Sequence, residues 1–263
     1  AKTGRPGPVV VDLPKDIVNP KILAPYDLPS KIKMRSYNPT VKGHPKQIKK
    51  SVELLCKAKR PVIYTGGGII AAEASYDLTQ LAEKLNAPVT NTLMGLGGIS
   101  GLHPQFVGML GMHGSYEANM AMHHADVILA VGARFDDRVT NATNKFCPDA
   151  KIVHIDIDPS SISKTVDVDI PIVGPVDSVL NEMLDIIDEL KTEPDAVALE
   201  SWWKQIEEWR SRHGGRYEKN ESGLLKPQEA IEGLWEATNG NAYICSDVGQ
   251  HQMFAAQYYK FDE

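Results

Sequence analysis

The sequence predicts an α/β fold, a doubly wound parallel sheet with helices on both faces. Its expected strands are apolar throughout rather than alternating, as in Val127 to Val131, which is typical of strands buried on both faces. They alternate with stretches of helical periodicity, such as Lys46 to Lys59. Strands and helices that alternate in this way form parallel sheets covered on both sides, so we expect one central domain of this class.

The first part of the chain contains an expected strand, a linker and the first helix of this domain. Pro8 to Leu13 is an expected strand of the buried type, although no partner strand is expected in its neighbourhood. Pro14 to Pro45 is an expected linker, because closely spaced prolines remove backbone donors and exclude a regular helix or a central strand. Lys46 to Lys59 is then an expected amphipathic helix, since Ile48 and Val52 begin an apolar stripe at helical spacing.

Strand and helix units follow. Pro61 to Thr65 is an expected strand that leads through Gly66, Gly67 and Gly68 into a helix at Glu73 to Leu85. Ala87 to Asn91 is a shorter strand, and the Gly-rich loop Met94 to Gly101 comes after it. The remaining strands of the expected sheet are equally apolar; they are Val127 to Val131, which a short helix precedes, Lys151 to Asp156 and Ile170 to Val173.

The last part of the chain is mainly helical. Val176 to Leu190 has one apolar face, and Pro175 suits its first helical position. Ser201 to Arg212 carries a stripe with two tryptophans that we expect to dock across a domain boundary. Gln228 to Thr238 is a further expected helix, and Ala242 to Ser246 a final strand.

These elements predict a division of the chain in which both ends are parts of flanking domains. The expected segments are 1–18, the end of a first domain; 19–45, a linker; 46–191, the central domain; 192–225, a linker and helix; and 226–263, the start of a third domain.

Composition excludes several classes of protein. A chain of 263 residues with 42% apolar residues can bury a sizeable core. Its net charge of −6, with basic residues dispersed among acids, argues against a nucleic-acid partner. It has neither an apolar run long enough for a membrane span nor a signal-peptide pattern, so we expect a cytoplasmic protein. The three cysteines match no zinc spacing, and we expect no metal site.

Candidate binding residues cluster after the expected strands, where ligands bind in open parallel sheets. Gly66 to Gly68 could bring backbone amides close to a phosphate, or could form a tight turn without a ligand. Arg134 and Arg138 could bind phosphate or carboxylate, or could pair with Asp136 and Asp137 on the surface. Asp156 ends a strand, where an acid can bind a ribose hydroxyl.

The histidines divide in the same way. His113 lies in a loop among small residues, which favours a ligand contact, whereas His123, His124 and His154 are expected to be ordinary helix-surface and strand residues. Asp158 is expected to cap the turn after Asp156. Together these residues predict a dinucleotide-type cleft.

Several runs in the chain closely resemble a known family. They are GRPGPVVVDLPKD, YTGGG, NTLMGLGG, GMLGMHGSYEANM, VGARFDDRVTN, HIDIDPSSISK and SDVGQHQMFAAQYY. In this order and spacing they resemble the large catalytic subunits of bacterial acetohydroxyacid synthase, also called acetolactate synthase, a thiamine-diphosphate-dependent family. The resemblance implies a central domain that holds FAD between a pyrimidine-binding domain and a diphosphate-binding domain.

The resemblance also implies a set of cofactor contacts. The positions that match FAD-contacting segments are Arg5, Gly66, Gly67, Gly68, Thr92, Leu93, Met94, Leu110, Gly111, Met112, His113, Gly132, Arg134, Asp136, Arg138, Val139, Asp156, Ile157, Ser161, Gly174 and Val176. Pro175 departs from the pattern, because many relatives carry Asp there. Met112, Asp137 and Arg138 match a substrate channel. The turn that grips thiamine diphosphate matches Val248, Gly249, Gln250 and His251.

The implied reaction condenses two pyruvates, or pyruvate and 2-oxobutanoate, with release of CO2, the first common step of branched-chain amino acid biosynthesis. FAD is implied to be structural and Mg2+ to accompany thiamine diphosphate. The implied catalytic glutamate and magnesium motif belong to parts of the flanking domains outside this chain, so we expect no catalytic residue here and no activity of this chain alone.

The implied partners are 2-oxo acids, further copies in a homodimer or tetramer, and a small regulatory subunit. Two alternatives remain: a related flavin-containing thiamine enzyme, such as pyruvate oxidase or glyoxylate carboligase, and a non-catalytic nucleotide-binding module.

Overall fold

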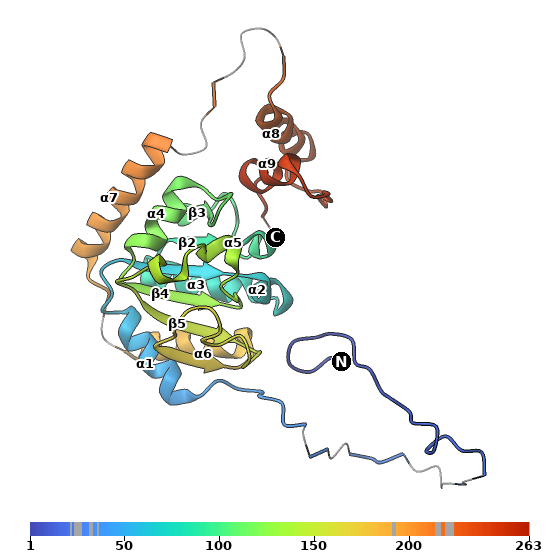
Figure 1. The fold of residues 1–263 in the computed structure, drawn as a ribbon. Coiled ribbons are helices and arrows are strands. Elements are labelled where there is room, and N and C mark those ends of the chain that lie inside the picture. The colour runs from blue at the N-terminus through green and yellow to red at the C-terminus, as the bar shows by residue number, and fades with distance from the viewer. Residues whose placement is uncertain are drawn as a thin grey trace.

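One parallel sheet forms the centre of the molecule (Figure 1). The computed structural model describes all residues except 22, 24–27, 32, 33, 36, 191, 192, 214–216, 219–223 and 263, so parts of both predicted linkers lie outside the described residues. Its strand order is β3-β2-β1-β4-β5-β6. The strands are β1 (Pro61–Thr65), β2 (Val89–Asn91), β3 (Phe106–Met109), β4 (Val127–Val131), β5 (Lys151–Asp156) and β6 (Ile170–Val173). The predicted α/β class is confirmed.

The strand order places a topological switch point between β1 and β4. From β1 the chain builds the sheet outward to β3, then returns to β4 and builds in the other direction to β6. β1 and β4 pair in parallel along their whole length, with Pro61 opposite Val127 and Thr65 opposite Val131. Ligands of such sheets bind beyond the carboxyl ends of the strands at this point.

Helices cover both faces. They are α1 (Pro45–Leu55), α2 (Gly67–Ala71), α3 (Ser75–Leu85), α4 (Tyr116–His124), α5 (Asp137–Thr140), α6 (Val176–Glu189), α7 (Ala196–His213), α8 (Pro227–Thr238) and α9 (Gln250–Tyr258). α1, α3 and α6 pack on one face, where Ile63 and Leu129 belong to their core. α4 and α7 pack on the other, where Val62 and Ile128 belong to a second core. Neighbouring strand residues thus serve opposite cores, which explains why the strands are apolar throughout.

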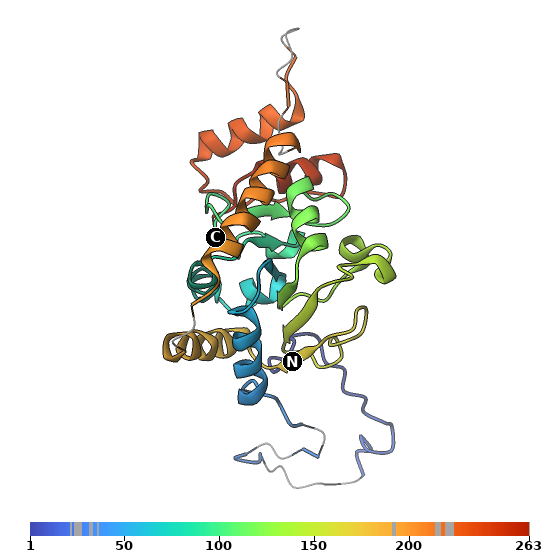
Figure 2. The ribbon, with the colours of Figure 1, turned by 90° about the vertical axis from the view of Figure 1, so that its left-hand side faces the viewer.

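α7 belongs to this sheet. Its predicted stripe is confirmed, because Trp202, Ile206 and Trp209 are buried in the second core. The indole nitrogen of Trp202 donates a hydrogen bond to the carbonyl oxygen of Pro61 at 3.1 Å. α7 packs along α4 (Figure 2), so it docks on the face of the sheet that α4 covers. It also begins at Ala196, inside the predicted linker.

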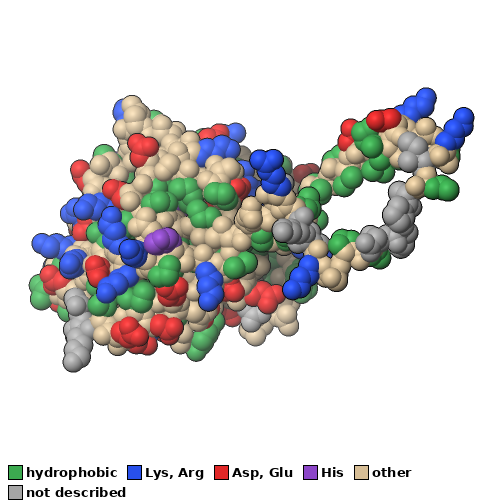
Figure 3. All heavy atoms as spheres, turned by 90° about the horizontal axis from the view of Figure 1, so that it is seen from below, with side chains coloured by type: hydrophobic (Ala, Val, Ile, Leu, Met, Phe, Trp, Pro, Cys, Tyr) green, Lys and Arg blue, Asp and Glu red, His purple; other side chains and the backbone are tan. Residues whose placement is uncertain are grey.

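Two predicted strands are absent from the described structure. Residues 8–13 and 242–246 form neither helix nor strand; the side chains of Val10 and Tyr243 are 91% and 102% exposed. Figure 3 shows hydrophobic side chains along the projecting segment that precedes α1. A strand needs a neighbour for its backbone hydrogen bonds, and the sheet ends at β3 and β6 without pairing to either segment.

Other differences are local. β3 was not expected, because it is short and contains Gly108 at φ +95°. The predicted turn at Gly66 to Gly68 is in fact the start of α2. α1 ends at Leu55 rather than Lys59, and Pro175 is the N-cap of α6 rather than its first helical residue.

Candidate functional site

The carboxyl ends of all six strands meet at one edge of the sheet, and the predicted FAD positions follow them. Gly66 to Gly68 follow β1, Thr92 to Met94 follow β2, and Leu110 to His113 follow β3. Gly132 to Val139 follow β4. Asp156 ends β5, with Ile157 and Ser161 after it, and Gly174 and Val176 follow β6. One edge therefore carries every predicted FAD position except Arg5, which comes from the segment before α1.

The loops after β1 and β4 touch through glycine backbone. The Gly68 amide donates to the Gly132 carbonyl oxygen at 3.0 Å. A Cβ atom on Gly66 would lie 2.4 Å from that oxygen, and one on Gly68 would lie 2.6 Å from the Gly132 Cα. Gly132 itself has φ +56°. The contact between the loops thus requires these glycines, and it leaves bare backbone at the switch point.

The loop after β4 is anchored by a buried aromatic ring. Phe135 is buried at φ +54°, and Tyr64, Phe146 and His154 pack edge-on around its ring, with centroids 5.3, 6.0 and 5.1 Å away. His154 was expected to be an ordinary strand residue; it is fully buried, and its Nε2 bonds to the carbonyl oxygen of Ala133 at 2.7 Å. The buried ring separates the exposed Arg134 from the start of α5.

Charged side chains of this loop lie at the surface. The Asp136 carboxylate caps α5 by accepting from the Arg138 amide at 3.3 Å, and it pairs with Arg134 at 2.5 Å. Hydrogen bonding to Asp137, and then to the Arg138 amide, lowers the pKa of Asp136. The surface ion pair considered for this loop is therefore present between Arg134 and Asp136. In the described part of the chain the Arg138 guanidinium makes no ion pair, so it is free to meet an anion.

The predicted channel residues lie together. The Met112 amide donates to the Arg138 carbonyl oxygen at 2.9 Å, and Met112, Asp137 and Arg138 are all exposed. Asn119, which sequence reasoning missed, holds this loop: its side chain accepts from the Gly111 amide at 2.9 Å and donates to the Gly111 carbonyl at 3.0 Å. An amide side chain within a mostly apolar helix was the available signal for it.

The end of β2 offers an unpaired donor beside exposed apolar groups. Thr65 donates from its hydroxyl to Oδ1 of Asn91 at 2.6 Å, whereas Nδ2 of Asn91 is buried with no hydrogen-bond partner. Leu93 and Met94 come directly after it and are 42% and 73% exposed. Because buried donors are normally paired, the Asn91 amide is a candidate donor to a ligand acceptor.

Arg5 reaches the end of β5. Its guanidinium lies 3.9 Å from Asp158. Asp158 caps its turn as expected, accepting from the amide and hydroxyl of Ser160 at 2.9 and 2.7 Å; this hydroxyl and then the amide lower the pKa of Asp158. Asp156 accepts from the Asp158 amide at 2.8 Å. The structure thus brings Arg5 to the loop that carries Asp156.

The predicted thiamine-diphosphate turn leads into α9. Gly249 is the N-cap of this helix, Gln250 and His251 are its first residues, and the side chain of Val248, before the cap, is 85% exposed. Further along α9, Gln257 donates from its side chain to the carbonyl oxygen of His113 at 2.6 Å. That hydrogen bond links the helix after this turn to the loop after β3.

Two cavities flank the edge. One of about 320 Å³ lies beside α5 and includes Leu110 and Val139. Another of about 470 Å³ lies under α9, and none of the predicted cofactor residues line it. Within the described residues no group of three or more His, Cys, Asp or Glu side chains could hold a metal ion, and none of the described helices combines the length and the apolar composition of a membrane span.

Comparisons with known proteins agree with this fold class. The chain is 55% identical over 265 residues to an acetolactate synthase large subunit of Haemophilus influenzae, and 56% identical over 263 residues to the acetolactate synthase isozyme 3 large subunit of Escherichia coli. An acetolactate synthase of Mycobacterium leprae is 39% identical over 263 residues. Each match covers 100% of this chain, but only 46%, 46% and 42% of these relatives, so the chain spans about half their length.

The family model for the central domain of thiamine pyrophosphate enzymes matches residues 48–183. This match begins in α1 and ends in α6, so it contains the whole six-stranded sheet and every loop at its carboxyl edge. More than half of the chain is matched. The chain therefore belongs to the family of thiamine pyrophosphate enzymes, and the sheet with its edge is their central domain.

Proposed function

We propose that this chain is part of an acetolactate synthase large subunit. The protein to which it belongs would condense two pyruvates, or pyruvate and 2-oxobutanoate, to 2-acetolactate or 2-aceto-2-hydroxybutanoate with release of CO2. This reaction is the first common step in the biosynthesis of valine, leucine and isoleucine. The observation that carries the proposal is the 56% identity to the Escherichia coli isozyme 3 large subunit over all 263 residues.

The sheet edge would hold FAD. Bare backbone at Gly66, Gly68 and Gly132 lets an extended cofactor approach the switch point closely. The unpaired amide of Asn91 offers a donor there. These features fit a dinucleotide whose ring system is apolar and whose linker carries oxygen acceptors, since Leu93, Met94 and Met112 supply exposed apolar surface beside them.

Charge along the edge supports an orientation for the cofactor. The free guanidinium of Arg138 would bind the diphosphate, because planar donors suit phosphate oxygens. Asp156 would accept from the adenosine ribose, with Arg5 near its loop. When bound, FAD would serve a structural role in the main reaction. The protein's own contribution would be to bind it, orient it and exclude water.

The remaining parts of the catalytic machinery would come from outside this chain. Val248 to His251 would contact thiamine diphosphate, and Mg2+ would be held by later residues of the third domain. No residue of this chain would be catalytic; Met112, Asp137 and Arg138 would line the route of the 2-oxo acids. A homodimer or tetramer and a small regulatory subunit would complete the enzyme, and a cytoplasmic location suits this role.

Two measurements test the proposal. The purified chain should be yellow and release FAD on denaturation. The longer protein supplied with pyruvate, thiamine diphosphate and Mg2+ should form 2-acetolactate. If pyruvate were consumed without being joined to a second 2-oxo acid, the result would instead favour a pyruvate oxidase. A condensation product formed from glyoxylate would favour a glyoxylate carboligase. A chain that bound NAD and ignored FAD would support the non-catalytic nucleotide-binding module.

A further inference from the structure

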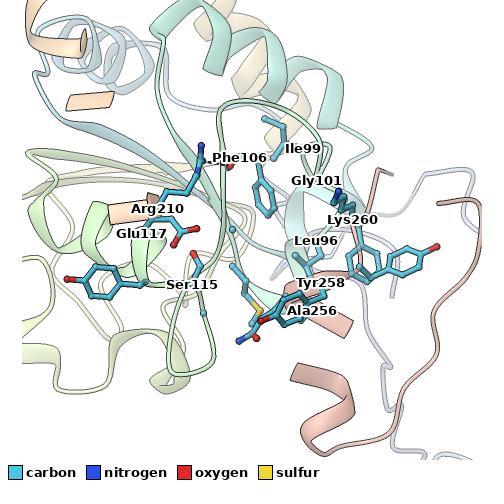
Figure 4. Close-up of a pocket in the computed structure, with 18 of the residues that line it drawn as sticks. Leu96, Ile99, Gly101, Phe106, Ser115, Glu117, Arg210, Ala256, Tyr258 and Lys260 are labelled. Carbon is cyan, nitrogen blue, oxygen red and sulfur yellow. Dashed lines mark hydrogen bonds between the residues drawn. The ribbon is translucent and has the colours of Figure 1, made fainter. Parts of the chain in front are cut away.

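A cavity of about 470 Å³ flanks the proposed cofactor edge without including any of its predicted FAD positions, and it lies between the loop before β3, the start of α4, the end of α7 and α9. We propose that this cavity binds a small primary alkylammonium ion through the carboxylate of Glu117. Figure 4 shows Glu117 and Arg210 on one side of it, with Ala256, Tyr258 and Lys260 on the other. Its volume is in the range of small-molecule sites.

Glu117 is a buried carboxylate with an unsatisfied oxygen. It belongs to the first turn of α4, which Ser115 caps by accepting from the Ala118 amide at 3.2 Å. The residue is only 7% exposed, and its Oε2 has no hydrogen-bond partner. Its place in the first turn puts the carboxylate near the positive end of the α4 dipole. A buried carboxylate oxygen without a donor is costly, so a ligand that supplied one would be stabilised.

The other charged groups around the cavity already have partners. Arg210 pairs with Glu207 at 2.5 Å and donates to the Phe106 carbonyl oxygen at 3.0 Å. Lys260 lies over the Trp235 ring, 4.8 Å from its centroid. Glu232 accepts from the Tyr217 hydroxyl. All three are more exposed than Glu117. Among the charged side chains that line the cavity, the negative charge of Glu117 is thus the one that lacks a partner.

The shape and donor set of the cavity define the ligand class. A divalent metal ion is disfavoured, because no cluster of three metal-binding side chains exists among the described residues. An ammonium group instead offers three N–H donors and one positive charge. Apolar residues on the walls, Leu96, Ile99, Phe106, Met109 and Ala256, would cover an alkyl chain. A primary alkylammonium ion satisfies both requirements.

This site is independent of the proposed FAD function, although it lies next to it. Gln257 lines the cavity and also donates to the His113 carbonyl oxygen. An occupant would therefore sit directly against the helix that holds the loop after β3. Ligand binding would tie α9 more firmly to that loop.

Three probes with the same alkyl chain test the head group: n-butylammonium, 1-butanol and butyrate, each titrated into the purified chain by NMR chemical-shift perturbation. We expect n-butylammonium to bind most tightly and butyrate least. Glu117→Gln keeps the shape and removes the charge, so it should weaken n-butylammonium binding by about tenfold and leave 1-butanol unchanged. Glu232→Gln is the matched control at the same cavity and should change n-butylammonium binding by less than about twofold.

A second variant keeps the test decisive if Glu117→Gln does not fold. Ala256→Phe leaves Glu117 in place and fills the cavity from α9, so it should abolish the n-butylammonium shifts. The proposal is overturned if n-butylammonium does not bind, if it binds equally well to Glu117→Gln, or if butyrate binds as tightly. Because no flavin enters these titrations, their failure would leave the FAD proposal standing.

Discussion

The imidazole Nε2 of His154 lies 2.7 Å from the carbonyl oxygen of Ala133. A carbonyl oxygen only accepts, so Nε2 carries the hydrogen of this bond, and Nδ1 of the ring is buried without a hydrogen-bond partner. Ala133 follows Gly132 at φ +56° and precedes Arg134 and Phe135, the latter at φ +54°. The histidine on β5 thus fixes the backbone of the loop after β4 between two left-handed residues.

We expect His154→Leu to destabilise the chain by about 1–3 kcal/mol, because the Ala133 carbonyl oxygen would be left buried without a donor. The loop that carries Arg134 and Arg138 would lose its anchor, so the affinity for FAD should fall as well as the free energy of unfolding. Urea denaturation and a flavin titration measure the two effects. His154→Gln keeps a donor near the same place and should recover part of both. Equal losses in the two variants would contradict a role for the hydrogen bond.

Gly68→Ala should be far more damaging than Gly67→Ala. A Cβ on Gly68 would lie 2.6 Å from the Gly132 Cα, which is backbone and cannot move alone, whereas the nearest atom to a Cβ on Gly67 is the Met94 Cβ at 3.3 Å. Overpacking of this kind costs about 1–3 kcal/mol. In Gly67→Ala, the gain in helix propensity of about 1 kcal/mol at the start of α2 opposes any small strain. Thermal unfolding of both variants compares them, and equal melting temperatures would refute the tight contact.

Trp202→Ala should cost about 3–5 kcal/mol, the usual range for removing a large buried aromatic side chain. Trp202 is 3% exposed and bonds to the Pro61 carbonyl oxygen at the start of β1. Lys204→Ala, on the exposed side of α7, is the control and should stay within about 0.5 kcal/mol. Urea denaturation measures both. A small effect of Trp202→Ala would mean that α7 is dispensable for the sheet.

The sequence predicts the central strands more accurately than the ends of the chain. β1, β4, β5 and β6 have the bounds expected from their apolar runs, because strands buried on both faces leave a continuous signal. Pro8 to Leu13 and Ala242 to Ser246 show the same local pattern and are coil. Local pattern does not tell whether a neighbouring strand exists, and strand formation depends on that neighbour.

The same limit applies to the site. The glycines at 66 and 68 could be expected to matter, but their contact with Gly132 depends on the pairing of β1 with β4. The sequence predicts His154 to be an ordinary strand residue, because its bond to Ala133 joins β5 to the loop after the neighbouring strand β4. The cavity at Glu117 joins α4, α7 and α9, three segments far apart in the sequence. Motifs locate loops, whereas tertiary packing decides which loops meet.

The carboxylate of Asp136 should make stability depend on pH. Its pKa is lowered from 3.8, first by Asp137 and then by the Arg138 amide, so the folded state favours the ionised form. The unfolded chain then binds the proton more readily than the folded chain. The contribution of ionised Asp136 to the free energy of unfolding is therefore complete above pH 3.8, and it is lost as the pH falls through the lower pKa of the folded state. Asp136→Ala should therefore cost about 0.5–2 kcal/mol near neutral pH, the usual value of an N-cap, and the difference from wild type should shrink in acid. Asp136→Asn can still cap α5, so it should lose less at neutral pH. Urea denaturation of the three proteins from neutral to acid pH measures their free energies of unfolding. If the difference between wild type and Asp136→Ala stayed constant with pH, the effect of Asp136 would come from packing rather than from its charge.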